Sequence, residues 1–493
     1  MNFEGEKIAR ILAILLLLGC GAIQKYTGPA SVLFVVLVVW VAIGAQWSRA
    51  SWFSLCLLSA CGCFSYLNSR GGLWNLAAFS ICAIAFVGNR EKLHLPHSTL
   101  DWWFRVLCLS LTVINLLGLC LCNPTAWSFR LLGIASFLGC LGIGWLAHCQ
   151  KLDEEKIALW LKTLGWCSVY LLFSSFNQKY VLLPFSLPFL PLRMDAEVGD
   201  AYGTTNASGT FGMGELMGEF QLLCGILFLS VLFNRNCMEK FHLSGYWLGG
   251  IICCCCINIL LANSRSCLLL LGVATALLFL YGSIIAKRLN RKALLLLGIG
   301  FIFMLYVAGD LVNWDNLSES YAKVGRDTKV TIENILNGEA INRGLPFQMG
   351  WARLQERSWV LGFGFGAGYS NLWAWTGNPD GFSPFFNAIV VDSHSLYLSL
   401  VPVFGWTGAV LYVSILLLTL LRLCAALLRP ELPEHWKMLI AGMACVWLMF
   451  LIDEYKINAL RSNNYLLLIW IFIGISHALC RCREPDTKDG VSS

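Results

Sequence analysis

The residues best suited to chemistry in this sequence surround His394, which stands where a long polar segment gives way to apolar sequence. The sequence Asp392-Ser393-His394-Ser395 is followed by nine residues and then by Gly405-Trp406-Thr407-Gly408. Membranes tolerate ionisable groups poorly, and imidazole is the side chain whose charge changes near neutral pH. His394 is therefore a candidate general base at a membrane surface, and Asp392 is a candidate to orient it.

The composition places His394 in a polytopic membrane protein. The chain has 493 residues, a mean hydropathy of +0.67 and only 13% charged residues, which excludes a soluble domain of this size and a disordered chain. Its net charge of +6 is small for this length and gives no indication of nucleic-acid binding. We therefore expect an all-α integral membrane protein embedded in the lipid bilayer.

Apolar runs along the chain predict about 12–14 transmembrane helices. A spanning helix needs roughly 20 apolar residues, and 14 runs reach or approach that length. The pair 52–67 and 73–88, and the last pair, could each be re-entrant, so 12 spans remain open beside 14. The candidate runs are 8–24, 29–47, 52–67, 73–88, 102–122, 126–149, 157–176, 214–233, 244–261, 267–285, 293–308, 394–421, 438–453 and 465–480.

Positive charge sets the expected orientation of these spans. The short loops and tails on the side of the termini carry 19 lysines and arginines, against 7 in the short loops of the other side. Because cytoplasmic loops carry the excess, both termini are predicted to be cytoplasmic. Segment 309–393 then becomes one long outer loop with short amphipathic helices, and His394 is the only one of the seven histidines on the outer face.

The same pattern divides the chain into three parts. Residues 1–204 are expected to form N-terminal transmembrane helices, residues 205–480 a second transmembrane region that includes the outer loop 309–393, and residues 481–493 a cytoplasmic tail. The 22 cysteines show no paired spacing typical of a zinc site. Neither of the two sizeable predicted outer loops, 177–213 and 309–393, contains a cysteine. They are interpreted as small apolar side chains, with no metal site and no disulfide framework.

The pattern from His394 to Gly408 resembles the signature of bacterial O-antigen ligases, in which a histidine and Asn, Ser or Gln precede nine residues and Gly-x-x-Gly. Asn263-Ser264-Arg265-Ser266 resembles the Ser-Arg-Gly element of that family, with Ser266 in place of glycine. Arg343 and the glycine-rich residues 362–366 resemble the segment that precedes the histidine in the ligase and polymerase superfamily.

A further element departs from the family pattern. Gly209-Thr-Phe-Gly resembles the superfamily's Gly-x-Phe element, but Gly214-Glu215 stands where Pro-Asn is usual, which puts the role of this element in doubt. The resemblance covers about residues 205–421. Glu215 and Glu219 fall near the outer start of the following span, where acids are costly unless paired or wet, so they could support a substrate cavity.

The resemblance implies a membrane glycosyltransferase without a metal, nucleotide or other cofactor. Such an enzyme takes a glycan from undecaprenyl diphosphate and passes it to the hydroxyl of a glycan or lipid A-core acceptor. His394 would activate that hydroxyl, and Arg265 and Arg343 would hold the diphosphate as planar cations. Gly405 and Gly408 would let a neighbouring helix approach closely. The site would face the periplasm from a bacterial inner membrane, in surface polysaccharide or lipopolysaccharide biosynthesis.

Three alternatives remain open. A polysaccharide polymerase, such as an O-antigen or exopolysaccharide polymerase, would use the same arginines but add the donor glycan to another lipid-linked glycan. A protein O-glycosylating relative is disfavoured because only a short hydrophilic stub follows residue 480. A transporter would need ionisable residues near the bilayer midplane and interrupted helices in paired halves, and neither is evident from the sequence.

Overall fold

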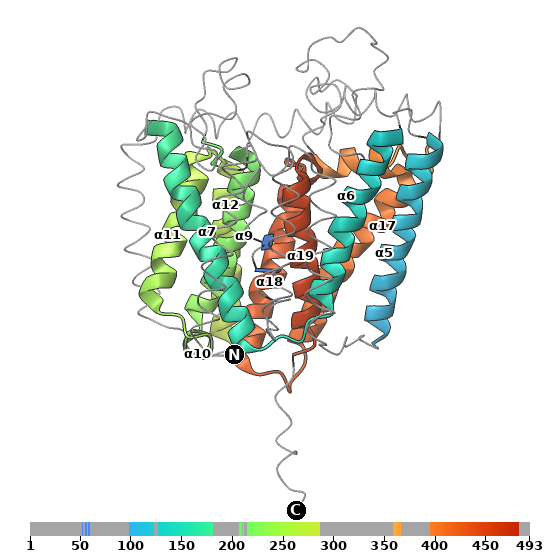
Figure 1. The fold of residues 1–493 in the computed structure, drawn as a ribbon. Coiled ribbons are helices and arrows are strands. Elements are labelled where there is room, and N and C mark those ends of the chain that lie inside the picture. Colours follow the sequence, from blue (N-terminus) through green and yellow to red (C-terminus); the bar gives the residue numbers. More distant parts are fainter. Residues whose placement is uncertain are drawn as a thin grey trace, which may run out of the picture.

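A computed structural model describes most of the predicted second transmembrane region, 205–480, and part of the N-terminal region, 1–204. The residues it describes are 98–122, 127–180, 207–209, 211, 214–285, 358–365 and 395–482, with the isolated residues 52, 55, 56, 58 and 59. Every regular element among them is a helix (Figure 1). The helices are α5 (Thr99–Leu117), η2 (Gly118–Cys122), α6 (Trp127–His148), α7 (Glu154–Tyr180), α9 (Gly214–Phe233), α10 (Arg235–Lys240), α11 (Gly245–Leu261), α12 (Arg265–Ile285), α17 (Leu396–Leu427), α18 (Glu434–Asp453), η4 (Ala459–Arg461) and α19 (Asn463–Leu479).

The structure confirms an α-helical, membrane-embedded protein. Six helical spans are long and apolar enough to cross a bilayer, namely α5 with η2, α7, α9, α12, α17 and α18, and shorter apolar helices lie within α6, α11 and α19. Each of the nine predicted runs between residues 102 and 480 that falls on described residues forms a helix. Runs 8–24, 29–47, 73–88 and 293–308, and most of 52–67, lie outside the described residues, so the total of 12–14 stays a prediction.

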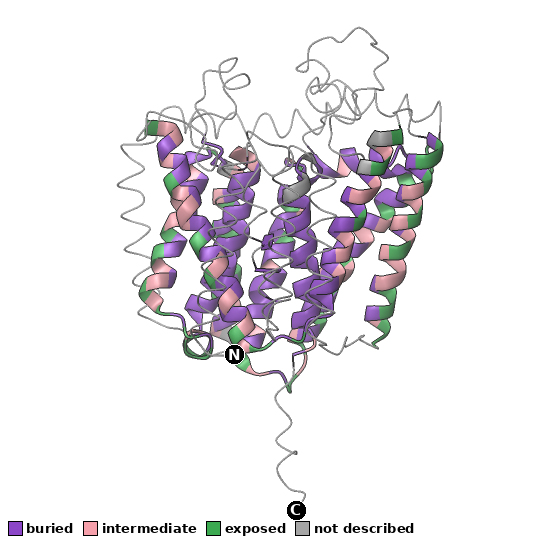
Figure 2. Cartoon of the chain, in the orientation of Figure 1, coloured by how far each residue is buried: buried purple, intermediate pink, exposed green. Residues whose placement is uncertain are grey.

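Helices α9, α18 and α19 form the centre of the bundle. Their side chains are buried almost throughout, whereas α5, α7, α11 and α12 each have exposed side chains along their length (Figure 2). The exposed side chains include large apolar ones such as Leu109, Leu121, Leu269 and Leu280. In water such surface would be unfavourable, so we assign it to contact with lipid. Trp102 and Trp103 on α5 and Trp127 on α6 are also exposed, as interfacial aromatics are.

Small residues set the closest helix contact. A Cβ on Gly474 of α19 would lie 2.2 Å from the carbonyl oxygen of Gly144 on α6, and a Cβ on Gly144 would lie 2.9 Å from the carbonyl oxygen of Trp470. The two backbones therefore touch where both side chains are hydrogen. In a bilayer, lipid is as apolar as leucine, so this close packing is what favours association of helices.

Helix α17 is interrupted rather than continuous. Its 32 residues would extend about 48 Å, which exceeds the roughly 30 Å hydrocarbon core. Gly405 adopts φ 68° and ψ 177°, a left-handed conformation that favours glycine, and Pro402 lies three residues before it. The break separates a short limb, residues 396–404, from a long limb, residues 406–427, which is long enough to span alone.

Residues 358–365 fill the break in α17. The amides of Phe363 and Gly364 donate to the carbonyls of Pro402 and Val403 at 3.1 and 2.7 Å, and the amide of Trp406 donates to the carbonyl of Trp359 at 3.0 Å. Backbone groups exposed by a break inside a membrane must find protein partners, and this segment supplies them. It belongs to the predicted outer loop 309–393, and its side chains Phe363 and Phe365 are buried in the bundle.

Gly405 and Gly408 have different close neighbours. A Cβ on Gly405 would lie 2.2 Å from the carbonyl oxygen of Val360, so the element that approaches Gly405 is segment 358–365. A neighbouring helix was predicted there, and the structure corrects that prediction. A Cβ on Gly408 would meet Phe404 of its own helix at 2.5 Å and Ile114 of α5 at 3.2 Å. The two glycines thus seat a loop and a helix respectively.

Candidate active site

The predicted site residues fall partly outside the described part of the chain. Arg343, Asp392 and His394 lie outside it, and Arg265 is described only as the first residue of α12. Glu215 and Glu219 lie in the first two turns of α9. The site must therefore be built from the helix ends that flank the predicted residues.

Those helix ends meet at one end of the bundle, around Asp453 and Glu454. The Cys267 thiol, in the first turn of α12, donates to the Asp453 carboxylate at 3.1 Å. The amide of Leu396, two residues after His394, donates to the carbonyls of Glu454 and Ile457, each at 3.0 Å. Two consecutive residues thus connect the start of the helix that carries Arg265 with the start of the helix that follows His394.

The Gly209-Thr-Phe-Gly element is held at the same end. The side chain of Gln178, near the end of α7, accepts from the amides of Ser208 and Gly209 at 3.0 and 2.9 Å and donates to the carbonyl of Gly209 at 2.6 Å. Phe211 is buried against Phe220. Gly214 then starts α9, so this element fixes where the helix with Glu215 and Glu219 begins.

Three buried carboxyl groups occupy the interior behind these helix ends. Glu219 and Glu454 are 0% exposed and Asp453 is 2% exposed. Glu219 Oε2 accepts from the Tyr465 hydroxyl at 2.6 Å, and Glu454 Oε2 accepts from the Ala459 amide at 3.1 Å. Glu219 Oε1 and Asp453 Oδ1 have no hydrogen-bond donor among the described residues. Glu219 was predicted to be a supporting acid, but its hydrogen bond with the Tyr465 hydroxyl was not predicted.

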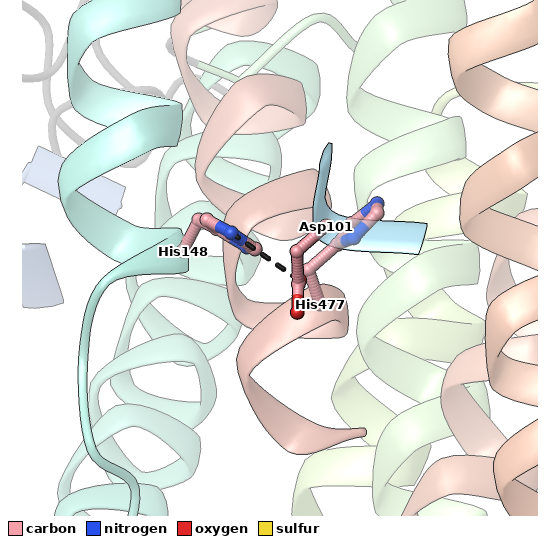
Figure 3. Close-up of side chains that lie close together, drawn as sticks. All are labelled: Asp101, His148 and His477. Carbon is pink, nitrogen blue, oxygen red and sulfur yellow. Dashed lines mark ion pairs between the residues drawn. The ribbon is translucent and has the colours of Figure 1, made fainter. Parts of the chain in front are cut away.

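A second polar cluster lies near the opposite end of the bundle, where α5 and α18 begin and α6 and α19 end. Asp101, His148 and His477 converge there (Figure 3), and all are at most 1% exposed. Arg422 of α17 donates to the Asp101 carboxylate, and its Nη1 lies 2.8 Å from His477 Nδ1. Nη1 of Arg481, which follows α19, lies 3.7 Å from Asp101.

The hydrogen bonds fix the tautomer of His477. An arginine can only donate, so His477 Nδ1 accepts from Arg422 and the ring proton is on Nε2. Nε2 then donates to the Thr419 hydroxyl at 3.1 Å, which donates to the carbonyl of Ile415 at 2.8 Å. His477 is therefore neutral and fully engaged, as a structural histidine is.

Asp101, His148 and His477 also have the ligand types of a metal site, with ligand atoms within 4.8 Å of one another. The Arg422 guanidinium already contacts both Asp101 and His477, and a divalent ion placed beside it would be repelled. The arrangement fits charge compensation of Asp101 by arginine better than metal binding.

Sequence reasoning missed this cluster although a signal existed. Asp101 opens an apolar run and Arg422 ends another, and ionisable residues at such positions usually have a named partner.

The Cys149 and Cys482 thiols are poorly suited to a competing site. Every cysteine among the described residues is a free thiol, and most are buried. Just outside the spans, burial raises the pKa of the Cys149 thiol to about 11 and that of Cys482 to about 12. Thiols that stay protonated at neutral pH are poor nucleophiles and poor metal ligands.

No protein-family model matches the chain. No curated protein sequence matches it either.

Proposed function

We propose that the protein is a membrane glycosyltransferase that moves a glycan from undecaprenyl diphosphate to an acceptor hydroxyl, in the manner of an O-antigen ligase. It is supported by the resemblance of residues 205–421 to that family and by one structural observation. Asp453 and Glu454 contact both the first turn of the helix that starts at Arg265 and the amide two residues after His394. The proposed site requires Arg265 and His394 at the same end of the bundle, and the starts of these two helices lie at the same end.

The chemistry assigns one role to each residue. The His394 imidazole takes the proton of the acceptor hydroxyl as its oxygen attacks the anomeric carbon. Arg265 and Arg343 hold the diphosphate and stabilise the negative charge that it gains as the leaving group. The amino ends of α9, α12, α17 and α19 point to the same end of the bundle, and their dipoles favour an anion there. Attack opposite the leaving group inverts the anomeric carbon.

The proposed site faces the periplasm from a bacterial inner membrane. The opposite end of the bundle carries the exposed basic residues Lys151, Arg235 and Lys240, as a cytoplasmic end does. We propose that both termini lie on that side. The acceptor is a glycan or lipid A-core. Because this acceptor lies on the periplasmic side, the donor must be presented on the outer leaflet.

The test in cells uses two histidine variants that undergo the same chemical change. His394→Asn should leave the protein in the membrane, let lipid-linked glycan accumulate, and reduce surface glycan by at least about 100-fold because the base is lost. His242→Asn is the control. His242 is exposed, lies at the other end of the bundle and has φ 50°, a conformation that asparagine tolerates. Normal surface glycan in the His394→Asn strain would remove the base assignment.

Deleting the gene separates the two transferase alternatives. Loss of a ligase leaves long polymerised chains on the carrier lipid, whereas loss of a polymerase leaves single repeat units. The gel pattern of the carrier-linked glycans in the deletion strain therefore chooses between them, and the proposal predicts long chains.

The transporter alternative gains one observation, the interrupted helix α17. A transporter would also need ionisable residues near the bilayer midplane, and the described acids of the outer half do not lie there. Glu219 is the sixth residue of α9, about 8 Å along the helix axis from its start, and Asp453 and Glu454 end α18. These acids lie near one end of the bundle rather than at its middle. Reconstituted protein should therefore transfer glycan without moving it across the vesicle membrane.

A further inference from the structure

Most of the described helices belong to one of two groups that meet on α18 (Figure 1). Helices α5, α6, α17 and α19 pack on one another and form the first group, and α7, α9, α11 and α12 form the second. Helix α18 packs on α9 and α12 of the second group and on α17 of the first. A small rotation of the groups about α18 would therefore change the separation of α9 and α19 and leave the packing within each group intact.

Two kinds of side-chain contact join α19 to the second group. Near the start of α7, Trp160 packs edge-on against Phe472 of α19 with ring centroids 5.0 Å apart, and both side chains are fully buried. At the candidate-site end of the bundle, the Tyr465 hydroxyl donates to Glu219 Oε2 at 2.6 Å. Phe211, just before α9, packs edge-on against the Tyr465 ring at 5.8 Å. Water cannot replace the first contact, which is apolar, but it can replace the hydrogen bond in the second.

The hydrogen bond leaves Glu219 incompletely satisfied. The side chain is 0% exposed, yet its Oε1 atom has no hydrogen-bond partner among the described residues. A buried carboxyl oxygen without a partner is costly whether or not the group is ionised. Water would reach this oxygen if the starts of α9 and α19 separated. The present arrangement is therefore balanced between the Tyr465 hydrogen bond, which favours it, and the dry Oε1, which opposes it.

We propose that Glu219, Tyr465 and Phe211 form a latch that holds the starts of α9 and α19 together, and that its release admits the lipid-linked donor. This inference rests on the proposed function. The amino ends of α9 and α19 border the proposed site, so their separation sets the room that a diphosphate-linked glycan has there. The latch also gives a role to the Gly209-Thr-Phe-Gly element, because its Phe211 contacts Tyr465.

The strength of the latch sets the fraction of open protein. Tyr465→Phe keeps the ring that Phe211 contacts and removes the hydroxyl that donates to Glu219. A hydrogen bond to a charged group is strong enough to change such an equilibrium by about 10-fold or more. A donor that binds only the minor, open form binds more tightly in proportion to the open fraction, so a weaker latch should improve donor binding.

The first test measures the latch without substrate. Hydroxyl-radical footprinting of the purified full chain in lipid nanodiscs, analysed by mass spectrometry, reports water access to Phe211, which is 3% exposed. Oxidation of Phe211 should rise by about 10-fold in Tyr465→Phe. Tyr412→Phe is the matched control, because Tyr412 is 1% exposed and its hydroxyl has no hydrogen-bond partner among the described residues. Unchanged Phe211 oxidation in Tyr465→Phe, or an equal rise in Tyr412→Phe, would overturn the latch.

Two substitutions of Glu219 test the hydrogen bond from its other side. Glu219→Gln keeps an oxygen that can accept from the Tyr465 hydroxyl, whereas Glu219→Leu keeps none. Oxidation of Phe211 should therefore rise much more in Glu219→Leu than in Glu219→Gln. Phe137 of α6, which is 1% exposed and lies within the first group, serves as the internal reference. A rise at Phe211 that is the same in both variants would show that the hydrogen bond does not hold the latch.

The second test measures the role of the latch in transfer. With a defined undecaprenyl diphosphate-linked glycan, Tyr465→Phe should lower the KM for the donor by up to about 10-fold, and Tyr412→Phe should leave it unchanged. Damage to a merely structural contact would not lower the KM. If Tyr465→Phe exposes Phe211 but does not lower the KM, the latch does not control donor entry, and the transferase still stands. If wild-type protein transfers no glycan, the proposed function and donor entry both fail, while footprinting still decides the latch.

Discussion

At the scale of residues, the most consequential interaction is the ion pair between Asp101 and Arg422, which are 321 positions apart in sequence. Both side chains are almost fully buried, so each charge depends on the other for compensation. The pair joins the start of α5 to the far end of α17, and His477 adds α19. A buried carboxylate at this place would otherwise be an uncompensated charge in a low-dielectric interior.

Removing Arg422 should therefore destabilise the protein strongly. Arg422→Met takes away the guanidinium in direct contact with Asp101 and leaves Arg481 Nη1 at 3.7 Å and His148 Nε2 at 3.5 Å, so it should lower the free energy of unfolding by about 3–5 kcal/mol. Thermal unfolding in detergent measures the change. Arg235→Met, which removes the arginine of an exposed pair with Glu239, should cost about 1 kcal/mol or less.

The double variant makes this prediction specific. Asp101→Asn combined with Arg422→Met should recover most of the lost stability, because no buried charge is then left alone. If the double variant is as unstable as Arg422→Met alone, the two side chains do not act as a compensated pair.

The proposed diphosphate ligands make a prediction at the same scale. Arg265→Lys keeps the charge but loses the planar fork, so it should raise the KM for the lipid-linked donor by about 10-fold or more. Arg235→Lys, at an exposed site on the opposite end, should leave the KM unchanged. An unchanged KM in Arg265→Lys would remove Arg265 from the diphosphate site.

At the scale of elements, α17 and segment 358–365 act as one unit. The break at Gly405 exposes carbonyls that the segment satisfies, and glycines on both sides allow contact at backbone distance. Because the short limb of α17 begins directly after His394, this unit sets where the proposed base enters the bundle.

An alanine at Gly405 should disrupt that unit. The added Cβ would lie 2.2 Å from the carbonyl oxygen of Val360, and the left-handed conformation alone costs about 1–3 kcal/mol. Gly405→Ala should therefore lower the unfolding temperature and transfer activity together. The control is Gly272→Ala in α12, where a Cβ meets nothing within 4 Å and the helix should be equally or more stable. Equal effects of the two variants would contradict the packing described here.

The sequence predicted the helices better than it predicted their interruptions. Run 214–233 became α9 with the same bounds, because a long apolar run is a local signal. The break in α17 depends on residues 358–365, which lie about 40 positions earlier, and periodicity holds no information about such a partner. Glu219 could be suspected from its charge in an apolar run, but its hydrogen bond with Tyr465 joins positions 246 residues apart.

At the scale of the whole molecule, the two polar clusters divide the bundle. Acids and helix amino ends gather at the proposed outer end, and the Asp101–Arg422 cluster and exposed basic residues lie toward the other. This polarity predicts that the connection between α18 and α19 is periplasmic and that the one between α17 and α18 is cytoplasmic.

Reporter insertions test that orientation. Alkaline phosphatase placed after Tyr455 should be active, because it folds only outside the cytoplasm, and the same enzyme placed after Glu431 should be inactive. Both positions lie in turns between helices and are exposed. The reverse pattern would place the proposed site on the cytosolic side and would contradict the use of an outer-leaflet donor.

The most direct measurement is glycan transfer by the purified full chain. The protein is mixed with a defined undecaprenyl diphosphate-linked glycan and several acceptors, without nucleotide sugar, and both the glycosylated acceptor and the released undecaprenyl diphosphate are quantified. The two products should appear in equal amounts with wild-type and His242→Asn protein, and His394→Asn should form neither. Wild-type protein that releases no undecaprenyl diphosphate, or His394→Asn protein that transfers glycan at the wild-type rate, would contradict it.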